Sequence, residues 1–368
     1  MSLSAFTPRT ATAAVENVGI AEDLVLVNTL FRKRNTHATK TIDIPELIGT
    51  AKLAPAVHAD APAVPVDWLT GALKTFTPPC LKPMKVLDEN KASVINPGIG
   101  RYTGPYTDPN AQIMEKVVRE WRDLRDRIER TNEVWAATML STGSLTITLA
   151  DGSSTALTLS VGYTGNGVLV GDSYTIQPAL SGTAKWDQAG SDPLDDLRRL
   201  ARQIRQYSNY GGRLTVLLGW QAAKAFLGND IVREYLDTRR IDVGNMTLAE
   251  RMNVIAQLGD VTVKEYTPAY ETQASTSSTK VIASPFAANR IVMAPADDTE
   301  IMSIEFGAIY ERPNGNLNEM PQFLETEFFA VTEQKTNPPV VNLILQSKPF
   351  PLVKKPSAIR VLDVVTLV

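Results

Sequence analysis

A proline-rich segment of more than fifty residues limits what this chain can fold into. Nine prolines lie between Pro55 and Pro109, and no helical pattern of apolar residues appears there. Proline fixes φ and removes a backbone donor, so the segment must be extended or turning. Loops of this length inside compact domains are uncommon, and they are usually functional or disordered.

The same segment is too apolar for a disordered linker. Its large apolar side chains include Trp68, Leu69, Leu73 and Phe76. We therefore expect an extended arm whose apolar residues pack against something outside their own domain. These four residues are the candidate subunit-interface residues of the arm.

A long amphipathic helix is predicted directly after the arm. It should begin near Asp108-Pro109, because Asp is a favoured N-cap and proline is favoured at the first helical position. One face carries apolar residues at helical spacing, and the other carries acid–base pairs four residues apart. A helix of about 31 residues would be roughly 46 Å long. The core positions predicted for it are Ile113, Val117, Trp121, Leu124, Ile128 and Trp135.

Two further regions follow the long helix. Residues 143–181 are typical of short hairpin strands broken by Asp151-Gly152 and 165–167. Residues 190–310 alternate helical and strand patterns, which predicts an α/β unit. Its first helix should run from Asp192-Pro193 to Gly211-Gly212. A buried strand is expected at 214–218, and a later helix at 246–258. Three strands, near 325–331, 340–346 and 359–364, are then expected to return to earlier parts of the chain.

Composition excludes several classes of function. The chain has one cysteine, Cys80, and two histidines, His37 and His58. A zinc site built from Cys and His needs about four ligands at set spacings, and this composition cannot supply them, so we expect no metal and no cofactor. We interpret both histidines as solvated loop residues, and an enzyme would require one of them to be indispensable. A net charge of −3 also argues against tight binding of nucleic acid through phosphates.

Charged pairs and glycine-rich stretches have simple structural explanations. Asp195-Asp196 fall in the first turn of a predicted helix, where the helix dipole favours negative charge. A second pair, Asp297-Asp298, lies in a predicted turn beside Pro295, and we interpret it as part of a solvated loop. Gly165-Asn166-Gly167 is not followed by a helix, so it does not resemble a phosphate-binding loop. Arg239 and Arg240 complement the dipole at a helix C-terminus, or they form ion pairs across a subunit boundary. Both alternatives stay open at this point.

Several segments, in this order, resemble the lambda-type major capsid protein family of tailed phages. Residues 42–44 and 52–57 are similar to the strand that leads into that family's extended loop, and 76–83 to the stretch that returns from it. The helix at 109–140 lies where the family has its spine helix. Residues 182–196 and 236–240 are similar to segments of its axial domain.

The resemblance implies an α+β fold of the Hong Kong 97 capsid type. Its expected parts are an N-terminal arm, an extended β loop, a peripheral domain with the spine helix and β hairpins, an α/β axial domain, and C-terminal strands that return to the peripheral domain. The corresponding ranges are 1–45, 46–107, 108–190, 191–315 and 316–368.

The resemblance also implies a major capsid protein that assembles into pentamers and hexamers around double-stranded DNA in a virion. Separate scaffolding and portal proteins, and a decoration protein, are the implied partners. No secretory signal or membrane span is evident, so we expect assembly in the host cytoplasm. Lysine–asparagine crosslinks between Lys74, Lys82 or Lys85 and Asn337 or Asn342 are not expected. The alternatives are a nanocompartment shell of similar fold and a tail or adaptor protein.

Overall fold

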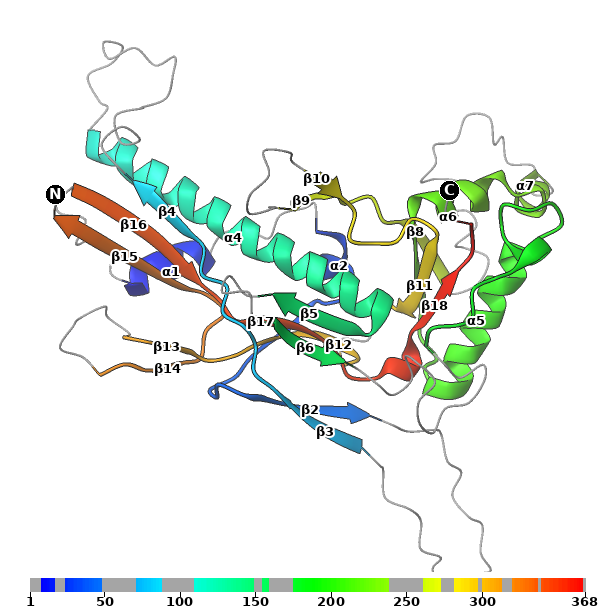
Figure 1. Ribbon diagram of the computed structural model, residues 1–368, viewed down its shortest axis with the longest axis horizontal. Coiled ribbons are helices and arrows are strands. Elements are labelled where there is room, and N and C mark those ends of the chain that lie inside the picture. Colours follow the sequence, from blue (N-terminus) through cyan, green and yellow to red (C-terminus); the bar gives the residue numbers. More distant parts are fainter. Residues whose placement is uncertain are drawn as a thin grey trace, which may run out of the picture.

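One long helix organises the molecule. The computed structural model describes the following residues: 8–16, 24–47, 71–87, 109–148, 154–158, 175–237, 261–272, 281–296, 300–312, 320–336 and 339–366. Helix α4 (Pro109–Thr142) crosses it as a straight rod (Figure 1). The strands β4, β15 and β16 lie near its first half, and α5, α6 and α7 lie beyond its last turn (Figure 1).

The predicted apolar face of α4 is confirmed. Five of its predicted core positions are buried, with exposed fractions of 0–2% for the first four and 9% for the last: Val117, Trp121, Leu124, Ile128 and Trp135. Ile113 lies within the helix, where only the backbone is described. The apolar periodicity of 3.6 residues therefore places this helix against the rest of the chain, as expected.

The N-terminal half of α4 packs on a three-stranded antiparallel sheet. Its strands, in spatial order, are β15 (Phe329–Thr336), β16 (Pro339–Gln346) and β4 (Met84–Leu87). Helix α1 (Pro8–Glu16) covers β15, and its Ala11 and Val15 join a core with Trp121. The start of the chain is thereby anchored to strands more than 300 residues away.

A second sheet forms the other end of the molecule. Its order is β18 (Arg360–Asp363), β11 (Arg290–Pro295), β7 (Leu214–Leu218) and β8 (Val261–Glu265), with β7 and β8 parallel. Three helices accompany this sheet: α5 (Pro193–Ser208), α6 (Trp220–Gly228) and α7 (Asp230–Asp237). Fully buried β7 carries five apolar or β-branched residues, as expected for a central strand.

Helix α5 starts as predicted and ends earlier than predicted. The Asp192 carboxylate accepts hydrogen bonds from the N–H groups of Leu194 and Asp195, both at 3.0 Å. The helix ends at Ser208, because Asn209 adopts a left-handed conformation with φ of 53°. The predicted end at Gly211-Gly212 was therefore wrong by about one turn.

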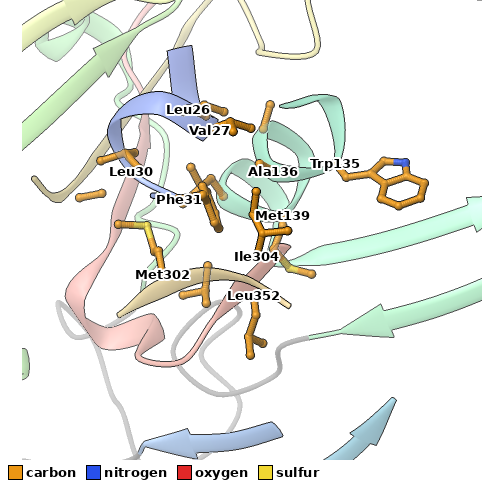
Figure 2. Close-up of a cluster of buried hydrophobic side chains, with 14 of the residues drawn as sticks. Leu26, Val27, Leu30, Phe31, Trp135, Ala136, Met139, Met302, Ile304 and Leu352 are labelled. Atoms are coloured by element: carbon orange, nitrogen blue, oxygen red, sulfur yellow. The ribbon is translucent and has the colours of Figure 1, made fainter. Parts of the chain in front are cut away.

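The two ends of the molecule are joined by a third sheet and a central apolar core. Strand β12 (Met302–Phe306) lies between β1 (Lys33–Thr36) and β17 (Pro349–Val353). Figure 2 shows side chains of α2 (Val25–Thr29), α4, β12 and β17 converging on one cluster, while the Trp135 ring points away from α2. This core is assembled from the beginning, middle and end of the chain.

Four two-stranded hairpins complete the described strands. They are β2 (Ile42–Leu47) with β3 (Gly71–Phe76), β5 (Ser144–Thr148) with β6 (Ser154–Thr158), β9 (Tyr270–Thr272) with β10 (Val281–Ala283), and β13 (Ile309–Glu311) with β14 (Gln322–Leu324). Short 3₁₀ turns occur at Gly182–Ala184 and Pro356–Ala358. The β5–β6 pairing agrees with the hairpin predicted after α4.

The C-terminal strands return to earlier parts of the chain, but not all to the same part. Strand β16 pairs with β4, as expected for a return to the spine-helix end. Strand β18 instead pairs with β11, inside the sheet predicted as the α/β unit. Strand β12, predicted in that unit, pairs with β1 and β17. Long-range pairing, which local patterns do not encode, decides these placements.

The remaining strand and helix predictions are close or untested. The strand expected at 325–331 begins at Phe329, because residues 325–328 form a connection. The helix expected at 246–258 lies outside the described residues. In the described part of the chain, no helix combines the length and apolar character that crossing a membrane requires.

Candidate assembly site

Ion pairs connect the N-terminal segment to α4 and to the connection that precedes β15. The Arg34 guanidinium donates two hydrogen bonds to the Glu129 carboxylate, at 2.8 and 3.0 Å, and one to Glu327 at 3.0 Å. The side chains of Arg34 and Glu129 are 13% and 1% exposed. We call Arg34, Glu129 and Glu327 the junction cluster.

Arg34 keeps its charge despite burial. Burial alone would lower the pKa of Arg34, but hydrogen bonds and the charges of Glu129 and Glu327 outweigh it and raise that pKa. Arg34 also lies over the Phe306 ring, 5.8 Å from its centroid. A planar guanidinium suits this position, because it meets the carboxylate through two parallel hydrogen bonds.

Glu133, one turn further along α4, holds helix α2. Its carboxylate accepts hydrogen bonds from the N–H groups of Leu26 (2.8 Å) and Val27 (2.9 Å), and from the Tyr266 hydroxyl (3.2 Å). The first N–H groups of a helix lack acceptors within that helix. Glu133 of α4 therefore supplies the acceptor for two such N–H groups of α2. Burial raises the pKa of Glu133, and these hydrogen bonds offset only part of that rise.

A second buried carboxylate, Glu305 on β12, binds strand β1. It accepts hydrogen bonds from Asn35 Nδ2 at 2.9 Å and Ser303 Oγ at 2.5 Å, and pairs with His37 Nε2 at 2.7 Å. Lys354 Nζ lies 3.1 Å from the same carboxylate. Our interpretation of His37 as a solvated loop residue was wrong, because its ring is half-buried against this carboxylate.

Acid should remove the stabilisation that Glu305 provides. Burial tends to raise the pKa of Glu305, but hydrogen bonds from Ser303, His37 and Asn35 lower it to about 2, below the ordinary 4.5. A depressed native pKa stabilises the fold above the unfolded-state pKa. That stabilisation is lost as pH falls from about 4.5 towards 2, and we expect it to be roughly 2 kcal/mol after allowance for solvent screening.

The measurement compares wild type with Glu305→Gln in urea unfolding of unassembled subunits. The difference in free energy of unfolding should be largest at neutral pH and should shrink towards zero near pH 2. Glu133 acts in the opposite direction, because its raised pKa makes its ionisation costly in the folded state. The variant comparison cancels this contribution. A difference that does not change with pH would contradict the assignment to Glu305.

Strand β4 is tied to α4 by a more exposed set of charges. Lys85 pairs with Glu120 and with Asp123, which also pairs with Arg127 at 2.9 Å. Burial would lower the pKa of Lys85, but these carboxylates raise it. Of the other residues considered for crosslinking, Lys82 forms an ion pair with Glu311, with 3.4 Å between its Nζ and the Glu311 Oε1. The expectation that no crosslink forms stays a prediction.

The predicted interface residues differ in how far the structure describes them. Trp68, Leu69, Arg239 and Arg240 lie outside the described residues, and of Leu73 only the backbone in β3 is described. Phe76 is buried at 6% exposure, and its ring centroid lies 4.5 Å from that of Phe350. Phe76 therefore belongs to the core of its own subunit, and we remove it from the candidate interface.

The other candidates from the sequence have structural roles or lie outside the described residues. Asp196 accepts a hydrogen bond from the Trp186 indole at 3.0 Å and pairs with Arg199. His58 and the pair at 297–298 are not described. Among the residues that are, no three His, Cys, Asp or Glu side chains group in a way that could hold a metal ion.

Sequence reasoning missed the buried charges at the centre of the molecule. Glu129 and Glu133 flank Asn132, and all three are at most 1% exposed. One signal was present: Asn132 falls within the apolar stripe of α4, between Ile128 and Trp135. A polar residue at a core position of an amphipathic helix indicates a buried polar network, because it must find hydrogen-bond partners there.

Comparisons with solved structures agree with this architecture. A protein assigned as the capsid protein of a prophage of E. coli CFT073 has a TM-score of 0.61 and 16% identity, over 98% of this chain and 99% of that one. A phage-related protein from Bordetella bronchiseptica RB50 has a TM-score of 0.54 and 12% identity, over 98% of both chains. The capsid of the cyanophage P-SCSP1u has a TM-score of 0.50 and 12% identity, over 94% of this chain and 90% of that one.

The predicted α+β capsid fold of Hong Kong 97 type is thereby confirmed. A search of curated proteins finds no match. The sequence model of one family, described as phage major capsid protein E, matches residues 7–364. This agrees with the resemblance to lambda-type capsid proteins. The chain therefore belongs to the phage major capsid protein E family, whose members are structural proteins and not enzymes.

Proposed function

We propose that copies of this chain assemble as pentamers and hexamers into the icosahedral head shell that encloses phage DNA. The match to the family over residues 7–364 carries the proposal. Separate scaffolding and portal proteins, and a decoration protein, are the partners, and assembly takes place in the host cytoplasm. DNA is enclosed without sequence-specific contacts, which fits a chain with a net charge of −3.

The architecture of the subunit supports this function physically. The β2–β3 hairpin forms its own two-stranded sheet, paired from Ile42↔Phe76 to Leu47↔Gly71. Residues 48–70, which the hairpin carries, include Trp68 and Leu69. Large apolar residues such as these need a partner surface, and obligate interfaces between subunits supply one.

We propose that Trp68, Leu69 and Leu73 contact a neighbouring copy. Arg239 and Arg240, which follow α7 (Asp230–Asp237), form ion pairs across a boundary between subunits. Arginine suits such a boundary, because its planar guanidinium binds carboxylates through two hydrogen bonds. Lys82 and Lys85 take no part in crosslinks.

Electron microscopy of the full chain tests the proposed function. We expect closed particles of uniform size when the chain is expressed with the head-assembly proteins that its genome supplies. A denaturing gel of the same particles should show single subunits and no ladder. Tubes, rings of tail diameter or only monomers, under conditions in which the chain is folded, would overturn the proposal.

A further inference from the structure

The hairpin of β13 and β14 presents a pair of aromatic rings to solvent. Tyr310 and Phe323 lie directly across from each other in the pairing, with ring centroids 5.0 Å apart. They are 54% and 51% exposed, and Met320, three residues before Phe323 in the chain, is 86% exposed. Of the seven large apolar side chains exposed in the described part of the chain, three lie here. We call these three residues the aromatic patch.

The opposite face of the same hairpin is anchored to the subunit. Ile309 is 1% exposed, and Glu311 accepts a hydrogen bond from Gln346 Nε2 at 2.8 Å. Lys348 Nζ donates to the carbonyl of Ala308 at 2.7 Å, just before β13. Successive side chains on a strand point to opposite faces, so this anchoring directs Tyr310 and Phe323 outward. The rings are held in place before any partner arrives.

The hairpin also keeps open strand edges. Within the residues that the structure describes, β13 and β14 form a sheet of two strands and pair with no third one (Figure 1). Open edges and exposed aromatic rings are both features of protein-binding surfaces. The combination points to a protein partner rather than to a small molecule.

The size of the aromatic patch decides which protein it binds. Burying a whole aromatic side chain covers about 150–250 Å². Two half-exposed rings and one methionine therefore offer roughly 300 Å². A stable complex between separate proteins buries about 800 Å² on each partner, so this patch alone cannot hold one. A copy already held by other contacts binds it at high effective concentration.

We propose that the aromatic patch docks on a neighbouring copy of this chain within the shell. This inference rests on the proposed function and adds to it a second contact, separate from the β2–β3 arm. Because the patch is small, the contact is weak between free subunits and forms only when other contacts hold them together. It is a contact of the assembled particle.

Serine substitution of both rings tests the proposal. Tyr310→Ser with Phe323→Ser should leave the fold intact, because both rings are exposed, and urea unfolding of free subunits checks this. Loss of the rings should raise the subunit concentration needed for closed shells by roughly tenfold or more, since each shell repeats the contact many times. Light scattering and electron microscopy measure that concentration under the conditions in which wild type assembles.

The matched control exchanges the two rings. Tyr310→Phe with Phe323→Tyr keeps the aromatic pair and its area, so shells should form at wild-type concentration. Equal assembly of the serine variant and wild type would overturn the inference alone. If wild type itself forms no shells, the proposed function is lost and the inference with it.

A photo-crosslinker identifies the occupant directly. A benzophenone amino acid at position 323, irradiated in assembled shells, should give dimers of this chain, with the crosslinked peptide identified by mass spectrometry. Irradiated free subunits should give few or none. Crosslinks only to a different head protein, or only within one subunit, would contradict docking on a copy.

Discussion

A variant in which a short Gly-Ser turn replaces residues 48–70 is expected to fold and to form no closed shells. The structure supports the first half, because Leu47 and Gly71 are paired neighbours at the end of the β2–β3 hairpin. A turn of four residues can join such neighbours without disturbing the hairpin. The central core, which includes Ile42 and Phe76, stays intact.

The second half follows from the apolar residues that the replacement removes. Trp68 and Leu69 are large, and aromatic anchors dominate the energetics of protein interfaces. We expect the yield of particles in electron micrographs to fall to background, and sedimentation to show small species. The thermal unfolding temperature of the free subunit should stay within a few degrees of wild type. Normal shells from this variant would contradict the proposed role of the arm.

A control separates loss of the arm from loss of its contacts. The double variant Trp68→Ser with Leu69→Ser keeps the full length of the loop. If these side chains bind a neighbouring copy, the double variant should also assemble poorly. Wild-type assembly of the double variant, together with failure of the shortened loop, would show that length matters and would exclude these two residues as anchors.

Arg34→Ala is expected to have the largest effect on subunit stability. It leaves the Glu129 carboxylate, 1% exposed, without the guanidinium that binds it through two hydrogen bonds. Removing one partner of a buried pair typically costs about 3–5 kcal/mol, because the remaining charge is uncompensated. Urea unfolding of the free subunit should show this loss as a lower midpoint.

Two controls define the cause of this loss. Arg127→Ala removes an arginine whose ion pair with Asp123 of α4 is exposed, with side-chain exposures of 59% and 39%. Loss of this exposed pair should lower the free energy of unfolding by less than about 1 kcal/mol. Arg34→Met with Glu129→Leu removes both charges, and we expect it to recover much of the stability, because well-packed apolar residues can replace a buried pair. Equal losses for Arg34→Ala and Arg127→Ala would contradict the assignment.

These two predictions concern different levels of the same molecule. The junction cluster and Glu133 join the N-terminal segment to α4, so they contribute to the stability of the single folded subunit. The arm and the aromatic patch are proposed to determine whether subunits join. Measuring both the stability of free subunits and the yield of particles for each variant distinguishes an effect on folding from an effect on assembly.

Local patterns were enough for the main elements. The spacing of Val117, Trp121, Leu124 and Ile128 predicts a helix because each apolar residue falls on one face every third or fourth position. Asp192 predicts the start of α5 because its short carboxylate reaches the first free N–H groups. The run at 214–218 predicts a buried strand. In each case the deciding interactions lie within a few residues of one another.

The sequence by itself determined the main elements, their order and, through ordered weak motifs, the capsid family. Only the tertiary structure decided that Arg34 meets Glu129, 95 residues away, and that His37 meets Glu305, 268 residues away. It also decided that Phe76 lies inside the subunit while Tyr310 and Phe323 lie outside. A charge or an aromatic ring looks the same in sequence whether it is buried or exposed. Burial depends on which distant strands pair, and that is a property of the whole chain.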